Sequence, residues 1–290
     1  MLHRFFESIH HFFYVLLQTL QLVFSKPIKI TVFRFRQSNF ISCFSQNSQQ
    51  YRTMLATINL EHILFLDIET VPESEHFDNL DDETKELWSH KSKYQRKDEF
   101  TPKEFYDRAG IWAEFGKIIC ISVGYFNFKG DTRAFRTTSF YGEESKLLKE
   151  FKNLLISHFS SSKHLLCGHN AKEFDFPYIA RRMLIHRIEL PYKLNLFGKK
   201  PWEIPHLDTM ELWKFGDYKH FTSLKLLANI LGIASPKDDI DGSQVRKVYY
   251  EEKNLDRIIT YCEKDVITTA QVFLRLRNEE LLAVDEIKNI

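Results

Sequence analysis

Ile63-Leu64-Phe65-Leu66-Asp67-Ile68-Glu69-Thr70 is the stretch of sequence that decides the fold. Its four leading apolar residues predict a strand that is covered on both faces and lies in the centre of a sheet. Asp67 and Glu69 are two residues apart, so on a strand their carboxylates point to the same side. Buried carboxylates are costly unless they are paired or bound to a metal ion. Taken alone, however, the pattern also fits a strand end with solvated acids.

The residues after this strand alternate between strand and helix patterns. β-branched and aromatic residues predict a hairpin from residues 117–126 and 131–140, joined by a turn at 127–130. A buried strand is expected at 164–169 and a third short strand at 206–210. Apolar residues at helical spacing predict helices at 143–159, 179–186, 222–231 (stopped by Gly232) and 255–277. The order predicts an α/β domain with a mixed central sheet flanked by helices.

A polar insertion at residues 71–116 separates the first strand from the hairpin. Thr101-Pro102-Lys103-Glu104 has the pattern of a capping box with proline at the first helical position, and Gly110 is a plausible stop. We therefore expect at least one short helix in the insertion. Its residues 91–97 (KSKYQRK) form the best local basic patch. Such a run is either a solvated helix face or a nucleic-acid contact.

Two further acidic positions follow later elements. Asp175 is expected near the start of a helix, where the helix dipole favours a carboxylate, so it could be a cap only. Asn170, just after the middle strand, suits an irregular turn or a substrate hydrogen bond. Tyr261 and Asp265 are four residues apart in the last helix and therefore lie on one face. Each acid alone has a structural explanation, and Asp208 after the third strand is interpreted as structural.

Together these motifs are more specific than they are separately. D-x-E on a first strand, N-x-x-x-F-D after a middle strand and Y-x-x-x-D on a late helix resemble the DEDD exonuclease superfamily of ribonuclease-H-like fold. The tyrosine is typical of the type found in proofreading domains of DNA polymerases. The resemblance runs from about residue 62 to about residue 276. It is strongest to stand-alone exonucleases related to the exonuclease domain of B-family polymerases.

The resemblance implies a two-metal 3′–5′ exonuclease that releases nucleoside 5′-monophosphates from single-stranded DNA. Mg²⁺, or Mn²⁺ in its place, prefers oxygen ligands, and two such ions can activate a water and stabilise the leaving oxygen. By resemblance, Asp67 bridges both metals, Glu69 and Asp265 lie on the nucleophile side, and Asp175 lies on the leaving-group side. Tyr261 would orient the attacking water.

The resemblance also suggests residues that contact the terminal nucleotide. These are Thr70, Asn170 and Phe174, the last by packing or stacking. A core position is the alternative for Phe174.

Two other functions remain open. One is a 3′–5′ exoribonuclease of the same fold, because nothing in the sequence identifies a group that reads a 2′-hydroxyl. The other is a non-catalytic module that binds nucleic-acid ends, which the presence of every acidic position argues against.

The formal charge of +1 hides an uneven distribution. Residues 1–53 hold six basic residues and one acidic residue, a net charge of +5. Subtracting these from the totals of 40 basic and 39 acidic residues leaves 34 and 38 in residues 54–290, a net charge of −4. A slightly acidic domain cannot hold a polyanion through its overall charge and needs local basic patches or metal ions.

The four cysteines are scattered and show no spacing suited to zinc. Two of them, Cys120 and Cys167, fall in apolar runs typical of buried thiols. We therefore expect a reducing, cytoplasmic location and no membrane partner.

Residues 1–53 differ in character from the rest. They contain an apolar stretch at 11–24 that is too short to span a bilayer comfortably, followed by a Ser/Gln-rich segment. Three interpretations are open: a translated upstream region with the real start at Met54, a poorly ordered or targeting extension, and a membrane anchor. The first is preferred, because Met54 lies a few residues before the first core strand. Function is therefore expected in residues 54–290, and mass spectrometry of the native N-terminus tests this boundary.

Overall fold

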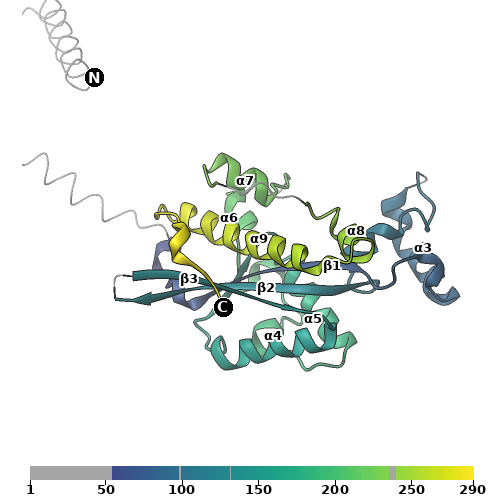
Figure 1. Ribbon diagram of the computed structural model, residues 1–290, viewed down its shortest axis with the longest axis horizontal. Helices are drawn as coiled ribbons and strands as arrows, with labels where there is room; N and C mark the ends of the chain where they lie inside the picture. Colours follow the sequence, from purple (N-terminus) through teal and green to yellow (C-terminus); the bar gives the residue numbers. More distant parts are fainter. Residues whose placement is uncertain (1–53, 98, 131, 218, 235–239) are drawn as a thin grey trace, which may run out of the picture. The chain divides into compact units, whose positions relative to one another are not determined.

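The computed structural model describes residues 54–97, 99–130, 132–217, 219–234 and 240–290. Within these ranges six strands form one sheet in the order β5-β4-β1-β2-β3-β6 (Figure 1). The strands are β1 (Ile63–Pro72), β2 (Gly116–Lys129), β3 (Thr132–Tyr141), β4 (Leu165–Gly168), β5 (Leu207–Asp208) and β6 (Ile287–Asn289). β2 pairs antiparallel with β1 and with β3. The other pairs are parallel: β4 with β1, β5 with β4, and β6 with β3. The predicted α/β fold with a mixed central sheet is therefore confirmed.

β1 occupies the interior of the sheet, as its apolar run predicts. Its side chains alternate between two hydrophobic clusters, with Leu64 and Leu66 on one face and Ile63 and Phe65 on the other. Helices α4 (Glu144–His158) and α5 (Asp175–Ile185) cover the first face, and α9 (Leu255–Leu276) covers the second (Figure 1). Asp67 and Glu69 follow the alternation of Ile63 and Phe65, so they face α9.

The shorter helices surround this framework. They are α3 (Asp82–Arg96), α6 (Thr209–Lys214), α7 (Leu224–Ile230) and α8 (Val245–Tyr250). α7 ends just before Gly232, whose φ of 68° is a left-handed conformation that favours glycine. The expected strand at 206–210 is only partly correct. It is limited to Leu207–Asp208, because the Asp208 carboxylate caps α6 and starts a helix at the next residue.

The insertion between β1 and β2 forms a small aromatic core of its own. Trp88 on α3 is fully buried among Phe105, Tyr106 and Trp112, and its indole donates to the Pro102 carbonyl at 2.7 Å. The capping box at Thr101 forms, but a 3₁₀ helix at Tyr106–Ile111 follows it instead of an α-helix. The α-helix of the insertion lies earlier, where Asp81 caps α3.

Gly110, expected to stop a helix, serves a different purpose. A Cβ atom there would lie 3.0 Å from the Val71 backbone, so glycine allows the insertion to approach the end of β1 closely. The basic run 91–97 lies on α3 and its end. Lys91 pairs with Glu114, and Arg96 binds the carbonyls of Phe100 and Ser89. Contact between the basic run 91–97 and nucleic acid remains a prediction.

α8 and β6 are not predicted from the sequence. Both are too short for apolar periodicity to mark them, with six residues in α8 and three in β6. The proposals for residues 1–53 fall outside the described residues. In the part of the chain that the structure describes, no helix is both long and apolar enough to cross a bilayer.

Candidate active site

The two acids of β1 lie against the middle of α9. Glu69 is 8% exposed and Asp67 is half-buried. One potential ligand atom from each of Asp67, Glu69 and Cys262 lies within 4.8 Å of the others. Cys262, on α9, donates to both the backbone oxygen and the Oδ2 atom of Asp67 at 3.4 Å. A thiol therefore fixes the first acid of the cluster.

A β-bulge lies beside these acids. The register between β1 and β2 shifts between Glu69 and Thr70, so that Ile119 on β2 has no partner on β1. Bulges bend a strand and redirect its side chains, and they are frequent next to active sites. Cys120, which pairs with Glu69 just before the bulge, is in side-chain contact with Cys262.

Asp175 reaches the same place from the other face of the sheet. It is the first residue of α5, is 3% exposed, and accepts hydrogen bonds from its own amide and from the amide of Ile68 between the two β1 acids. The N-cap position belongs to Phe174, whose side chain makes no capping bond. Asp175 is thus turned into the sheet rather than serving as an N-cap.

Asp265 and Tyr261 complete the arrangement from α9. Tyr261 donates a hydrogen bond to the Asp265 carboxylate, and Asp265 is close enough to Asp67 and Glu69 to repel their negative charges. The structure therefore brings together all four predicted carboxylates and the predicted tyrosine, from one strand (β1) and two helices (α5 and α9).

The electrostatics of the cluster are unfavourable for four negative charges. Burial, followed by repulsion from Asp175, Glu69 and Asp265, raises the pKa of Asp67 well above its usual range. Burial and the charge of Asp265 raise the pKa of Glu69 in the same way, and burial raises that of Asp175 to about 7. Several carboxylates can be ionised together in such a site only if a positive charge compensates them.

This donor set suits hard divalent cations. Carboxylate oxygens are the ligands that Mg²⁺ and Mn²⁺ prefer. Among the described residues, no basic side chain is a cause of the pKa shifts of Asp67, Glu69 and Asp175. Cys262 is the contact that the sequence analysis missed. Its position beside Tyr261 in Tyr-Cys-Glu-Lys-Asp, on the buried stripe of α9, was the available signal.

Tyr261 is held in its protonated form. Burial and the nearby charges of Asp265, Glu69 and Asp67 raise its pKa above the ordinary value of about 10. At neutral pH the hydroxyl therefore donates hydrogen bonds and does not act as a base.

The loop after β4 is held in place by Asp208. One Asp208 oxygen accepts from the amides of Asn170, Met210 and Glu211, and the other accepts from the amide of Lys172. These four backbone hydrogen bonds agree with the structural interpretation of Asp208. They also fix the loop that precedes Asp175.

The three predicted substrate contacts differ in their surroundings. Asn170 has a φ of 61°, and its Oδ1 atom is buried without a hydrogen-bond partner among the described residues. Phe174 is half-buried against the main hydrophobic cluster, 5.3 Å from the Tyr178 ring. Thr70 shares a hydrogen bond with the Tyr178 hydroxyl. Asn170 is the residue with an unused polar atom.

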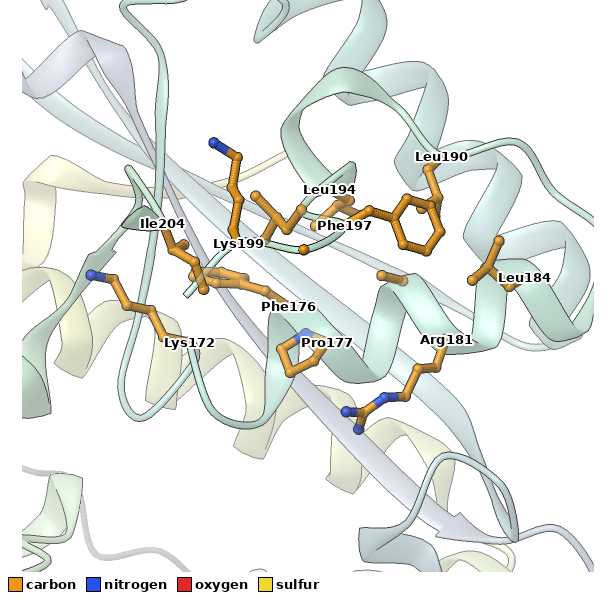
Figure 2. Close-up of a pocket in the computed structure, with 13 residues that line it drawn as sticks. Lys172, Phe176, Pro177, Arg181, Leu184, Leu190, Leu194, Phe197, Lys199 and Ile204 are labelled. Atoms are coloured by element: carbon orange, nitrogen blue, oxygen red, sulfur yellow. The ribbon is translucent and has the colours of Figure 1, made fainter. Parts of the chain in front are cut away.

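A separate cavity lies on the outer surface of α5. It measures about 340 Å³, and Phe176, Leu184, Leu194 and Phe197 give it an apolar lining, with cations such as Arg181 at its margin (Figure 2). None of the four carboxylates lines it. The cavity is therefore distinct from the acidic site.

Comparisons with known proteins give a family match and a structural similarity. The family model described as "Predicted 3'-5' exonuclease related to the exonuclease domain of PolB" matches residues 111–284. Asn170, Asp175, Tyr261 and Asp265 lie inside that range, which begins after β1. A family B DNA polymerase from the hyperthermophilic archaeon Pyrobaculum calidifontis is similar over 72% of this chain and 23% of the polymerase chain, with 14% identity and a TM-score of 0.43. No curated protein matches the sequence.

Proposed function

Because the chain belongs to the family of predicted 3′–5′ exonucleases related to the exonuclease domain of PolB, we propose that it removes nucleotides from the 3′ end of single-stranded DNA. The products are nucleoside 5′-monophosphates. The single observation that carries the proposal is the cluster of four carboxylates, in which Tyr261 is hydrogen-bonded to Asp265. The four are Asp67, Glu69, Asp175 and Asp265. A nuclease acts on nucleic acid, and the choice of DNA follows the family resemblance.

The four carboxylates are the proposed ligands of two divalent cations, Mg²⁺ or Mn²⁺. Bound there, the cations would supply the positive charge that activates a water and stabilises the leaving oxygen. The raised pKa values of Asp67, Glu69 and Asp175 support this assignment, because a group that resists ionisation when the site is empty gains most from a cation.

The remaining side chains would bind and orient the substrate. Tyr261 keeps its proton, so its hydroxyl orients a water or a phosphate oxygen by donating to it. Asn170 offers its unused Oδ1 atom to a donor of the terminal nucleotide. We assign Thr70 and Phe174 to the same nucleotide, and the partial burial of Phe174 suits contact through one edge of the ring.

The proposed catalytic unit is residues 54–290, with residues 1–53 an extension that contributes nothing to the site. The family match and the whole carboxylate cluster fall inside 54–290, which supports this division. Detection of peptides from residues 1–50 in the native protein would remove the proposed start at Met54.

The decisive experiment uses matched DNA and RNA oligonucleotides, single- and double-stranded, labelled at either end. With Mg²⁺ we expect a 3′ label to be lost first from single-stranded DNA, EDTA to stop the reaction, and Asp67→Ala to abolish it. Faster hydrolysis of RNA than of DNA would identify RNA as the substrate, with the same metal-dependent 3′–5′ reaction. Full activity of Asp67→Ala would overturn the proposal, and tight binding without turnover in Mg²⁺ would favour a non-catalytic module.

A further inference from the structure

A second, basic pocket lies on the same face of the sheet as the carboxylates. It measures about 310 Å³ and is lined by Lys117, Tyr249, Tyr250, Lys253 and Leu255. Lys117 on β2 is paired with Val71, which is two residues beyond Glu69 along β1. A hydrophobic cluster that contains Val71, Tyr249 and Tyr261 connects the pocket to the active-site tyrosine.

The pocket holds its two ammonium groups over aromatic rings. The Lys117 Nζ atom lies 5.5 Å from the centroid of the Tyr249 ring and 5.4 Å from that of Tyr250, and the Lys253 Nζ atom lies 5.8 Å from the latter. The Tyr250 hydroxyl donates to the Pro72 carbonyl at 2.6 Å, which fixes that ring. Cation–π contacts restrict the side chains but leave their positive charge in place.

Neighbouring acids do not neutralise these lysines. Glu73 pairs with Arg182 at 2.8 Å, Glu251 with Arg246 at 3.3 Å, and Glu252 with Arg257 at 2.7 Å. In the described chain no carboxylate lies within ion-pair distance of either pocket lysine (Lys117 and Lys253). Two cations, one of them half-buried, thus share a pocket without a counter-ion, in a region of the sequence that is acidic overall.

We propose that this pocket binds a backbone phosphate of the nucleic-acid strand, upstream of the 3′-terminal nucleotide. The proposal rests on the nuclease function and adds a substrate contact to it. Lysine is a common ligand of phosphate, and a phosphodiester supplies the single negative charge that the pocket lacks. The tyrosine rings offer faces on which a neighbouring base can stack.

The spacing fits a strand whose 3′ end lies in the active site. Val71 is about 7 Å from Glu69 along β1, and Leu255 is about 9 Å from Tyr261 along α9. At about 3.4 Å per nucleotide in a stacked strand, this corresponds to about two or three nucleotides. A dinucleotide would therefore not reach the pocket, whereas a longer strand would.

The length dependence of hydrolysis tests the contact. The wild type and the double variant Lys117→Gln/Lys253→Gln are compared on the dinucleotide and on an oligothymidylate of about 12 nucleotides. We expect the ratio of kcat/KM for the long substrate to that for the dinucleotide to fall about tenfold in the variant, mainly through KM. An equal ratio in the two proteins would overturn the proposal.

Binding supplies a readout that does not depend on turnover. In an Asp67→Ala background, fluorescence anisotropy of the labelled oligothymidylate gives the affinity at several salt concentrations. Adding Lys117→Gln/Lys253→Gln to this background removes one phosphate contact. It should weaken binding and reduce the slope of log K against log salt by about 0.7. An unchanged slope would contradict the contact even if the protein hydrolyses nothing. The two proposals therefore fail separately.

Three controls define the result. Lys129→Gln, at the far end of β2, removes a lysine of the same strand outside the pocket and should behave as the parent. Lys117→Arg keeps the positive charge and should have the same slope of log K against log salt as the parent. A variant with a folding defect would not keep that slope. Inorganic phosphate is added as a competitor. If it displaces the oligothymidylate at micromolar concentration from the parent but not from the Lys117→Gln/Lys253→Gln variant, the pocket binds free phosphate and not the strand.

Discussion

The Tyr261 hydroxyl donates a hydrogen bond to the Asp265 carboxylate, one turn further along α9. This bond joins the only aromatic hydroxyl that we assign to the reaction to one of the proposed metal ligands. Since the pKa of Tyr261 is raised, the proton stays on the tyrosine throughout the neutral range. The tyrosine therefore acts by donating a hydrogen bond, and removing its oxygen should leave the carboxylates in place.

We predict that Tyr261→Phe lowers kcat by about 10- to 100-fold without abolishing the reaction. A hydrogen bond to a charged group contributes about 1.5–3 kcal/mol, which corresponds to this range. Steady-state kinetics beside Asp67→Ala provide the measurement. If Tyr261→Phe were as inactive as Asp67→Ala, the tyrosine would have a larger role than orienting a water.

Asn170 allows backbone conformation to be separated from substrate contact. Its φ of 61° is strained for most residues but not for glycine, and its Oδ1 atom is unused. Asn170→Gly should therefore keep the stability of the protein while raising KM. Asn170→Ala should raise KM similarly and also cost about 1–2 kcal/mol of unfolding free energy. An unchanged KM in Asn170→Gly would remove this residue from the substrate site.

Much of the fold follows from local patterns in the sequence. The apolar run before Asp67 predicts the central strand, and the helical spacing of Ile259, Cys262 and Val266 predicts that α9 packs on the core. The carboxylates could be grouped because the ends of β1 and β4 and the face of α9 each carry one short motif. Their order along the chain predicts a shared site through its resemblance to the DEDD exonucleases.

Other features depend on contacts between distant residues. The bulge opposite Thr70 follows from the register of β1 with β2, which hydrophobic periodicity does not encode. The position of α3 follows from Trp88 packing on Trp112, 24 residues later. The Cys262 contact and the paired lysines of the basic pocket likewise require the tertiary structure, because Lys117 and Lys253 are far apart in sequence.

Arg182 is a buried cation on which the position of α5 depends. It is 4% exposed, donates to Glu144 at 2.8 Å and to the Ala113 carbonyl at 3.0 Å, and pairs with Glu73. We predict that Arg182→Ala lowers the unfolding free energy by about 3–5 kcal/mol, because the buried Glu144 carboxylate loses its guanidinium partner and keeps only the Ile118 amide and His186. Urea denaturation measures this, and Arg181→Ala, its neighbour outside the core, should change stability by less than about 0.5 kcal/mol. Equal effects would contradict the assignment.

His206 should make stability depend on pH in the acidic range. Its Nδ1 atom accepts from the Leu166 amide, its Nε2 atom faces the Lys193 carbonyl at 2.7 Å, and burial lowers its pKa to about 4. The unfolded chain, with a pKa near 6.5, takes up the proton first as pH falls. The contribution of this residue is therefore complete above about pH 6.5 and is lost as pH falls towards 4, about 3 kcal/mol in all.

Comparison of variants isolates this effect. Unfolding free energies of the wild type and His206→Gln, measured between pH 4 and 7, should converge as the pH falls. His158→Gln, which replaces an exposed histidine at the end of α4, should follow the wild-type curve throughout. Parallel curves for the wild type and His206→Gln would show that the histidine does not titrate as expected.

The carboxylate cluster should act with the opposite sign when divalent metal is removed. The folded-state pKa of Asp175 is raised to about 7, and those of Asp67 and Glu69 are also raised. The native state therefore keeps protons that the unfolded chain releases near pH 4. Stability from this source is present below about pH 4 and is lost as pH rises through about 7. Above that pH the metal-free protein carries mutually repelling charges in a buried site.

Asp175→Asn should consequently stabilise the metal-free protein. Asparagine retains an oxygen that can accept from the Ile68 amide but carries no charge, so we predict a gain of about 2–4 kcal/mol in EDTA at pH 8. Mg²⁺ should stabilise the wild type strongly and the variant weakly, because the variant lacks one proposed ligand. Thermal unfolding of both proteins, in EDTA and in Mg²⁺, provides all four values. A variant that is less stable in EDTA and still gains fully from Mg²⁺ would show that Asp175 is a structural residue and not a metal ligand.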